Sequence, residues 1–210
     1  MATNGSRGLL IVLSGPSGCG KGTIVERLLA QRDDTVVSIS VTTRQPRPGD
    51  VDGVQYFFRT REQVETMIRE DALLEYAQYN GNYYGTPRAA VEQQLAAGRN
   101  VILEIEVQGA EKVMHRVADY VSVFLVPPSM EELERRLRGR GTETEDNVKN
   151  RLRAACDELA HASSYQYLVL NDEVETAVRR VNTIIETEKM RYDRSKMILE
   201  DLNYAEPQGY

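Results

Sequence analysis

Hydrophobic and polar residues follow two patterns along the chain, and segments with one pattern alternate with segments of the other. Short apolar runs at residues 9–13, 101–107 and 121–126 have the length and composition of buried β-strands. Between these runs, apolar residues recur every three to four positions, which predicts amphipathic helices. The first helix is expected from about Gly20, with an apolar face made of Ile24, Val25, Leu28 and Leu29. Strands that alternate with helices indicate an α/β fold with a central parallel sheet flanked by helices.

Local signals mark where later helices begin and end. Thr86 followed by Pro87 favours a helix start, and Gly98 favours its end. A last short strand is expected at 167–170, and the chain beyond about Met190 is expected to be a polar helix. Three further helix starts have capping-box spacing: Ser129 with Glu132, Thr142 with Glu145, and Asp172 with Glu175.

Residues 40–86 interrupt the alternation and are expected to form an insertion with its own small antiparallel sheet. Alternating residues predict a strand at 36–41, before most of the insertion. Within the insertion the pattern predicts a short strand at 56–58, a helix at 61–71, and strands around a turn at Asn80-Gly81. A second insertion is expected at 135–154. The whole chain, 1–210, is then one domain whose core comprises residues 7–39, 87–134 and 155–205.

Composition narrows the classes of function. The 210 residues carry a formal net charge of −6, which disfavours a nucleic-acid partner because such proteins usually present a basic face. No apolar run approaches membrane-spanning length, so no membrane partner is expected. The two cysteines, Cys19 and Cys156, suggest no disulfide framework, and a cytoplasmic location is expected. Cys19 could have thiolate character near a helix start, although no catalytic role is assigned to it. Assembly into a homo-oligomer is left open.

The stretch GPSGCGKGT nearly matches the phosphate-binding pattern G-x-x-x-x-G-K-[ST]. Because it follows an apolar strand and precedes a helix, its N–H groups can surround phosphates, with Lys21 reaching the β- and γ-phosphates. The pattern breaks at Gly22, and the hydroxyl expected near Mg²⁺ comes one place later, at Thr23. A glycine-rich turn that happens to precede a lysine is the alternative. The residues assigned to the nucleotide are Gly15, Pro16, Ser17, Gly18, Cys19, Gly20, Lys21, Gly22 and Thr23.

Glu104 and Glu106 stand near the end of the predicted strand 101–107, two residues apart and hence on one face. Ligands of open α/β sheets bind at that end, and buried carboxylates are costly unless they are paired or ligating. One carboxylate could act on Mg²⁺ through water and the other could accept from a substrate. Glu104, together with Thr23, is assigned to the metal. A salt-bridged pair at the strand edge is the alternative.

A second group of candidates lies in the insertion. Arg44 and Arg47 flank a proline, and two guanidinium groups on one loop can clamp a phosphate, with tyrosines such as Tyr56 and Tyr84 as donors. A solvated charged loop is the alternative. Glu75 could accept the N1 and N2 hydrogens of guanine, a pair that adenine lacks, or be an ordinary surface carboxylate.

The segment 135–153 is rich in arginine. Arg136 and Arg140 share a helix face, Arg140 stands between two glycines as in a hinge, and Arg151 follows on the next helix. Cationic charge on a movable segment is typical of a lid that neutralises transferring phosphates. The alternative is a solvated, charged helix pair.

Taken together, these motifs resemble guanylate kinase over nearly the whole chain. The matching segments are GPSGCGKGT (15–23), TTRQPRPGDVDGVQYFF (42–58), GNYYGT (81–86), EIEVQG (104–109), RLRGRGTET (136–144) and ND (171–172). The resemblance implies a P-loop kinase fold with a core, a GMP-binding subdomain at 40–86 and a helical lid at 135–154. It implies Mg²⁺-dependent transfer of the γ-phosphoryl group from ATP to GMP, giving ADP and GDP, in purine nucleotide metabolism and GMP recycling.

The resemblance also implies roles for single residues. Its GMP ligands are Ser40, Arg44, Arg47, Tyr56 and Tyr84 at the phosphate, and Glu75, Thr86 and Glu106 at guanine. Its catalytic residues are Lys21, Arg44, Arg136, Arg140 and Arg151, and Asn171 lies beside the adenine of ATP. The chain departs from the family pattern at Glu104 and Glu106, where some members have aspartate, and at Gly22, which leaves the protein ligand of Mg²⁺ open.

Two other functions stay open. One is a related P-loop kinase with another small phosphate acceptor, which Glu75 and Thr86 disfavour. The other is a non-catalytic guanylate-kinase-like binding module, which the intact Lys21 and loop glycines disfavour.

Overall fold

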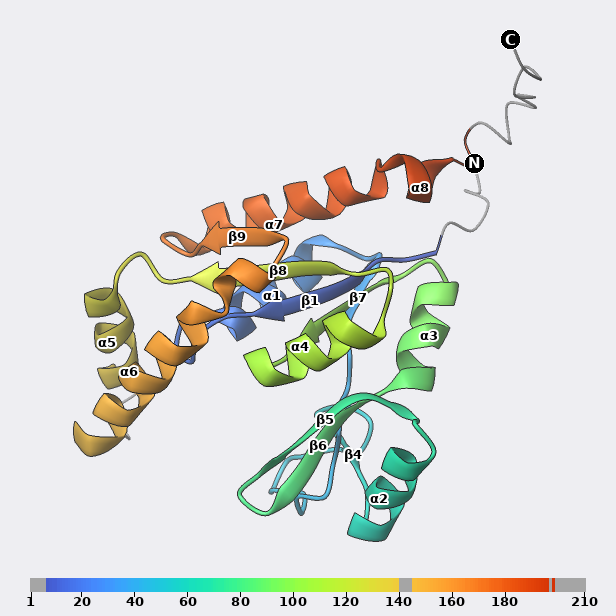
Figure 1. Cartoon of the computed structure of the whole chain (residues 1–210), viewed down its shortest axis with the longest axis horizontal. Coiled ribbons are helices and arrows are strands. Elements are labelled where there is room, and N and C mark those ends of the chain that lie inside the picture. Colours follow the sequence, from blue (N-terminus) through green and yellow to red (C-terminus); the bar gives the residue numbers. More distant parts are fainter. Residues whose placement is uncertain (1–6, 140–144, 197, 199–210) are drawn as a thin grey trace.

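The chain folds into two sheets with helices packed against them (Figure 1). The computed structural model describes residues 7–139, 145–196 and 198. Its larger sheet has five parallel strands in the order β2-β7-β1-β8-β9. These strands are β1 (Leu10–Ser14), β2 (Thr35–Val37), β7 (Asn100–Glu104), β8 (Val121–Val126) and β9 (Tyr167–Leu170). The predicted parallel α/β core is confirmed.

Helices cover both faces of this sheet. They are α1 (Lys21–Gln31) and α7 (Val174–Lys189) on one face, and α3 (Arg88–Ala96) and α4 (Val107–Arg116) on the other. In Figure 1, α7 lies above the sheet and α4 below it. The central strand β1 is apolar throughout because Ile11 and Leu13 enter one buried cluster while Leu10 and Val12 enter the other.

The smaller sheet belongs to the insertion. Its strands are β3 (Val41–Thr42), β4 (Phe57–Phe58), β5 (Leu73–Tyr79) and β6 (Asn82–Pro87), in the order β4-β3-β6-β5. The expectation of a purely antiparallel sheet is wrong in one pair, because the loop from β3 returns the chain to run parallel at β4. The turn at Asn80-Gly81 is confirmed, and both residues have the positive φ that a tight hairpin turn requires. Helix α2 (Arg61–Arg69) covers this sheet through Val64.

Two predicted strands are divided differently in the structure. The run 36–41 is not one strand: β2 ends at Val37 in the larger sheet, and β3 begins at Val41 in the smaller one. The run 101–107 ends as a strand at Glu104, and Glu106 is the N-cap of α4, with φ −74° and ψ 160°. Glu104 and Glu106 therefore do not share a strand face. An apolar run alone does not separate a strand from the buried first turn of the next helix.

The predicted helix starts at Ser129 and Asp172 have different outcomes in the structure. Ser129 caps α5 (Met130–Arg138) as expected, because its hydroxyl accepts from Glu132 N at 3.1 Å. The prediction at Asp172 is wrong, since the N-cap of α7 is Glu173. The Asp172 carboxylate instead accepts from the N–H of Glu173 and pairs with Arg180, a competition that spacing does not reveal.

Other helix boundaries agree more closely. α3 begins directly after Pro87, and Gly98 follows its end with φ +77°, as expected. Near the carboxyl end, α7 stops at Lys189, and a short polar helix, α8 (Tyr192–Ser195), follows where a polar helix was expected. Most of the expected helix lies outside the described residues. Thr142 lies outside the described residues.

The segment after β8 forms a two-helix arm. α6 (Glu145–Ala160) packs on α5 through Leu133, Leu137 and Ala155, and the two helices extend together from the core in Figure 1. α6 runs without interruption past residue 154, where the lid was expected to end. A short 3-10 turn, η1 (Ala162–Ser164), then leads into β9.

No helix among the described residues combines the length and the apolar character needed to cross a membrane.

Candidate active site

The loop between β1 and α1 contains two glycines, Gly18 and Gly20, whose replacement would strain the backbone. Gly18 and Gly20 have φ of +89° and +97°, which strain any side-chain-bearing residue. A Cβ on Gly18 would lie 2.7 Å from Leu137 Cδ2, and one on Gly20 would lie 2.6 Å from Asn171 Nδ2. The N-cap of α1 is Gly20, which has no side chain to cap the helix, so the first N–H groups of α1 can face an anion.

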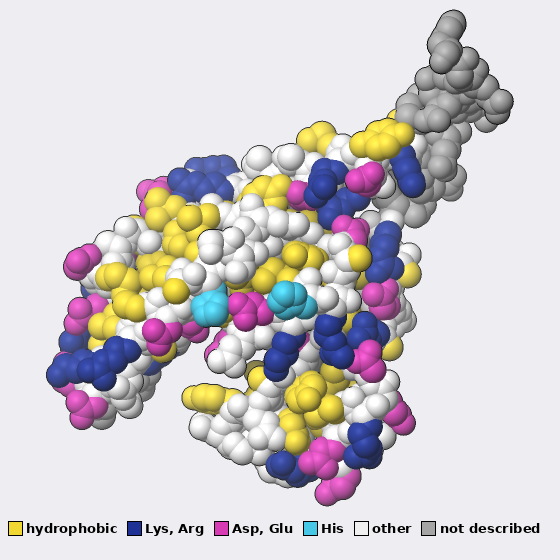
Figure 2. Space-filling view, in the orientation of Figure 1, with side chains coloured by type: hydrophobic (Ala, Val, Ile, Leu, Met, Phe, Trp, Pro, Cys, Tyr) yellow, Lys and Arg dark blue, Asp and Glu magenta, His cyan; other side chains and the backbone are white. Residues whose placement is uncertain are grey.

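Lys21 lies over this loop and beside a cleft. Its Nζ donates to the carbonyl oxygens of Gly15 at 2.5 Å and Pro16 at 3.3 Å. The cleft has a volume of about 410 Å³. Figure 2 shows this side of the molecule hollowed between the α5–α6 arm and the smaller sheet. The cleft is lined by Ser17, Gly18, Gly20, Lys21, Gly22, Thr23, Glu104, Ile105, Glu106 and Glu158.

A second cleft, of about 380 Å³, opens toward the smaller sheet. It shares Glu104, Ile105 and Glu106 with the first cleft, so the two meet at the end of β7. It is lined further by Ser40, Tyr56, Glu75, Ala77, Tyr79, Tyr84, Gly85, Gln108 and Gly109. The structure thus brings the insertion residues and the loop residues to two sides of one acidic segment.

Glu75 lines the second cleft and forms a buried pair with Thr86, which does not itself line the cleft. Thr86 Oγ1 donates to Glu75 Oε1 at 2.7 Å, and Glu75 is only 6 % exposed. Burial raises the pKa of Glu75, while the bond from Thr86 lowers it. A Cβ on Gly109 would lie 3.0 Å from Glu75 Oε2, so the glycine leaves room for the carboxyl group. Glu75 is therefore no surface carboxylate.

Neither arginine of the predicted phosphate clamp lines the second cleft itself, but Arg44 lies against Tyr56, which does. Arg44 pairs with Asp50 at 2.9 Å, and its guanidinium carbon lies 5.4 Å from the ring centre of Tyr56. Arg47 is exposed and does not line the cleft, although its N–H donates to Asp50 at 2.8 Å. The rings of Tyr56 and Tyr84 meet edge to face at 5.8 Å. Asp50, which organises this loop, was missed, although it ends the turn sequence RQPRPGD.

The acidic segment faces Lys21. The walls of the cleft raise the pKa of Glu104, and the charge of Lys21 opposes that rise. No group of three metal-ligating side chains stands together in the described part of the chain. Mg²⁺ commonly takes one or two protein oxygens and completes its shell with phosphates and water, so Thr23 and Glu104, which line the same cleft, fit that ion.

Two of the three predicted lid arginines touch the loop. Arg136 donates to the carbonyl oxygens of Cys19 at 3.3 Å and of Asn171 at 3.2 Å. Arg151 Nη2 donates to Ser17 Oγ at 2.7 Å. Arg140 lies outside the described residues. These contacts disfavour a merely solvated helix pair.

Asn171 packs against the loop at Cys19, and both side chains are buried. Asn171 is 2 % exposed and its Nδ2 donates to Cys19 O at 2.6 Å. Its Oδ1 is buried without a partner among the described residues. Burial raises the pKa of the Cys19 thiol, so the idea of thiolate character there is wrong. The Asn171 side chain therefore supports the loop through its hydrogen bond to Cys19 O.

Glu158 was not among the site residues predicted from the sequence. It lines the first cleft and its Oε2 accepts from Ser17 N at 3.1 Å. It comes from α6, about 140 residues along the chain from Ser17, and no local pattern marks it.

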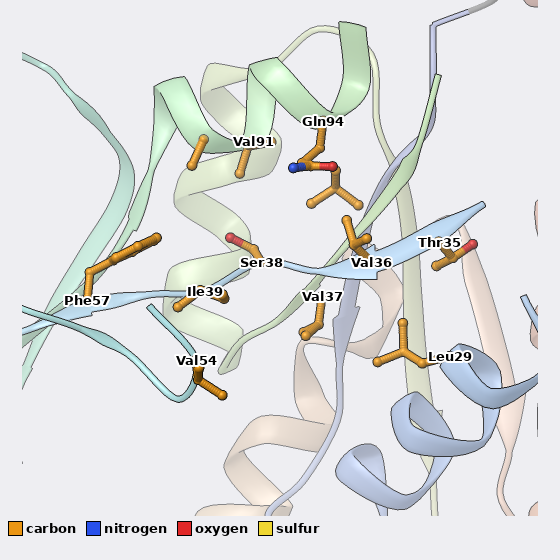
Figure 3. Close-up of a pocket in the computed structure, with 12 residues that line it drawn as sticks. Leu29, Thr35, Val36, Val37, Ser38, Ile39, Val54, Phe57, Val91 and Gln94 are labelled. Atoms are coloured by element: carbon orange, nitrogen blue, oxygen red, sulfur yellow. The ribbon is translucent and has the colours of Figure 1, made fainter. Parts of the chain in front are cut away.

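A third cleft, of about 410 Å³, lies between β2, α3 and the smaller sheet (Figure 3). Its lining is mostly apolar, including Leu29, Val36, Val91 and Phe57, and it contains neither the loop lysine nor an acidic side chain. It therefore does not suit a charged nucleotide.

Comparison with known proteins identifies relatives for nearly the whole chain. Residues 7–188 match the family described as guanylate kinase. The guanylate kinase of Desulfitobacterium hafniense is 52% identical over 195 residues, which cover 93% of this chain and 98% of the relative. That of Lactococcus lactis is 53% identical over 188 residues, covering 90% and 92%. The crystal structure of guanylate kinase from Anaplasma phagocytophilum superposes with a TM-score of 0.73 at 33% identity, over 96% of this chain and 98% of that one.

Proposed function

Because the chain belongs to the guanylate kinase family, we propose that it transfers the γ-phosphoryl group of ATP to GMP, giving ADP and GDP. The observation that carries this proposal is the meeting of two clefts at Glu104, Ile105 and Glu106. The phosphate loop with Lys21 lies in one cleft and the buried Glu75 in the other. A phosphoryl donor in the first cleft would face an acceptor in the second.

GMP is the acceptor that the second cleft suits. Glu75, held by Thr86, offers a carboxylate to the two N–H groups on the guanine edge, with Glu106 as a further acceptor. The phosphate would be bound by Ser40, Arg44, Arg47, Tyr56 and Tyr84. In support, Arg44 lies against Tyr56, where one guanidinium fork can serve Asp50 and a phosphate oxygen together.

ATP is assigned to the first cleft. The loop residues 15–23 would hold its phosphates through backbone N–H groups and Lys21, and Asn171 would lie toward its base. Thr23 and Glu104 would hold Mg²⁺, directly or through water. When bound, Mg²⁺ neutralises part of the phosphate charge and so favours the approach of a second anionic nucleotide.

Positioning and charge stabilisation account for catalysis in this proposal. Lys21, Arg44, Arg136, Arg140 and Arg151 would surround the moving phosphoryl group, whose negative charge is spread over its oxygens in the transition state. Transfer between two bound nucleotides forms no bond to the protein, so no protein nucleophile is required. The inserted subdomain at 40–86 and the lid at 135–154 are proposed to close over the core at 7–39, 87–134 and 155–205, excluding water from the reaction.

The direct test is GMP-dependent formation of ADP from ATP and Mg²⁺, run with a panel of acceptors. GMP is expected to be the preferred acceptor, and Lys21→Ala is expected to lower the rate by at least about a hundredfold while leaving the fold intact by circular dichroism. An unchanged rate in Lys21→Ala would contradict the proposed role of the loop.

The acceptor panel and a measurement of ATP binding separate this function from the two alternative functions. Faster turnover of AMP or of a sugar phosphate would identify a related kinase with another acceptor. Absence of ATP binding in calorimetry would favour the non-catalytic binding module. The cytoplasmic location, the roles in purine metabolism and GMP recycling, the lack of a nucleic-acid partner and the state of assembly stay predictions.

A further inference from the structure

Ser17 of the phosphate loop is held from one helix by two side chains of opposite charge. Its backbone N–H donates to Glu158 Oε2 at 3.1 Å, and its hydroxyl accepts from Arg151 Nη2 at 2.7 Å. Arg151 and Glu158 are seven residues apart on α6, close to two helical turns, so they project from one face. The loop is thus attached at a single residue to a helix that begins at the lid.

A carboxylate at this place is unexpected on electrostatic grounds. Glu158 lines the cleft that we assign to the phosphates of ATP, where a negative charge repels the ligand. Burial raises the pKa of Glu158 and the charge of Glu106 adds to the rise, whereas Ser17 N–H, Lys21 and Arg151 oppose it. An acidic side chain in this cleft needs a compensating role, and the bond to the loop N–H is the contact through which it can act.

We propose that Glu158 is a positioning residue for ATP: it holds the phosphate loop at Ser17 against the part of α6 that follows the lid, so that the loop keeps its place on the core when the lid moves. The inference rests on the proposed function, because it concerns the ATP side of that site. On the other side of the loop, Leu137 of α5 lies against Gly18 so closely that no Cβ fits between them. The loop is therefore held between the two helices of the arm, by apolar contact on α5 and by Glu158 on α6.

The proposal predicts an effect on one nucleotide only. Glu158→Ala removes the acceptor, so the loop loses its attachment and the KM for ATP is expected to rise about tenfold, the scale of one hydrogen bond to a charged group. The KM for GMP is expected to stay within about twofold, because Glu158 does not line the second cleft. Glu158→Gln keeps an oxygen acceptor for Ser17 N–H, so its KM for ATP is expected to remain within about threefold of the parent.

The experiment measures both KM values and kcat for the parent, Glu158→Ala, Glu158→Gln and a control, Asp157→Ala. Asp157 is the neighbouring carboxylate on α6 and is exposed, so its loss is expected to change neither KM. A rise in the KM for ATP in Glu158→Ala, restored by Glu158→Gln, supports the proposal. A lower KM for ATP in both Glu158 variants would mean that the carboxylate only repels ATP, and would overturn it. Equal changes in both KM values, or none, would overturn it too.

Direct calorimetry of ATP binding keeps this result distinct from the proposed function. If the parent binds ATP but does not phosphorylate GMP, the proposed function fails. The inference is then judged on the dissociation constants for ATP, with the same expected order of the four proteins.

Discussion

At the scale of single residues, the environment of Glu75 is expected to make the proposed recognition of guanine dependent on pH. The two N–H donors of guanine require an ionised carboxylate, and burial raises the pKa of Glu75 above its ordinary value. The KM for GMP is therefore expected to fall as pH rises through the pKa of Glu75. Thr86→Ala removes the hydrogen bond that lowers this pKa, so the fall is expected to occur at higher pH. The measurement is the KM for GMP from about pH 5 to about pH 8, where folded proteins are usually stable.

The control for this profile is Glu75→Gln, whose amide does not ionise. Only the titration of the GMP phosphate itself, near pH ~6 as for other phosphate monoesters, is expected to remain in that variant. If the KM for GMP of Thr86→Ala depends on pH as that of the parent does, Glu75 does not control guanine binding.

Thr23 is the residue through which the break at Gly22 can be tested. Thr23 lines the cleft with Lys21 and Glu104, and its hydroxyl is the one nearest in sequence to the loop lysine. Thr23→Val keeps the shape but removes the oxygen, so the Mg²⁺ concentration needed for half-maximal rate is expected to rise several-fold. Thr23→Ser is the matched control and is expected to preserve the Mg²⁺ requirement. An unaltered requirement in Thr23→Val would leave the metal to Glu104 and water.

At the scale of elements, two glycines of one junction are expected to respond to the same substitution with opposite signs. Gly20→Ala forces a side chain into a left-handed conformation, 2.6 Å from Asn171 Nδ2, and is expected to lower the free energy of unfolding by about 1–2 kcal/mol. Gly22 lies within α1, where a Cβ would be 3.7 Å from Glu104 Oε1, an ordinary contact. Gly22→Ala is therefore expected to raise the free energy of unfolding by about 0.5–1 kcal/mol.

Thermal unfolding of the two variants checks this pair. A change of 1 kcal/mol corresponds to roughly 2–4 °C in Tm for a chain of this size. Equal shifts in the same direction would mean that the loop relaxes around either substitution. The result also bears on the sequence motif, because a stabilising alanine would show that glycine at 22 is not required by the fold.

At the scale of the whole molecule, α4 joins the two sheets. Arg116 donates to the carbonyl oxygens of Leu73 and Leu74 and to Asp71, and Lys112 donates to Tyr76 O at 2.7 Å. These bonds hold β5, and hence Glu75, against the core. Arg116→Ala is expected to raise the KM for GMP a few-fold, because the half-exposed bonds are partly screened by solvent. The KM for ATP is expected to stay unchanged.

Hydrogen exchange of residues 73–87 provides the second readout for Arg116→Ala, and faster exchange there is expected than in the parent. Arg27→Ala is the control, since Arg27 is exposed on α1 and pairs at 3.8 Å with Glu175 on α7, within the core. Equal exchange and equal KM values in Arg116→Ala and Arg27→Ala would mean that α4 does not determine where the smaller sheet sits.

The candidate site was predictable from sequence where function depends on local chemistry. The glycine loop, Glu75 and Arg136 were proposed from side-chain type and local pattern, and Thr86 from the resemblance to guanylate kinase. Residues that act through distant partners were not. Glu158 reaches Ser17 only because α6 packs on α5, and Asp50 gains its role only when the loop folds onto Arg44. In the sequence alone, Glu158 and Asp50 cannot be distinguished from ordinary surface carboxylates.

The same distinction between local patterns and distant partners applies to the fold. Hydrophobic periodicity by itself determined the parallel core and most helices, because burial of apolar side chains is the dominant force and its period is set by local geometry. Only the tertiary structure decided that residues 36–41 belong to two sheets, that β3 and β4 run parallel, and that Glu106 opens α4. Those outcomes depend on which backbone partners each residue meets, and partners far apart in the chain leave no local pattern.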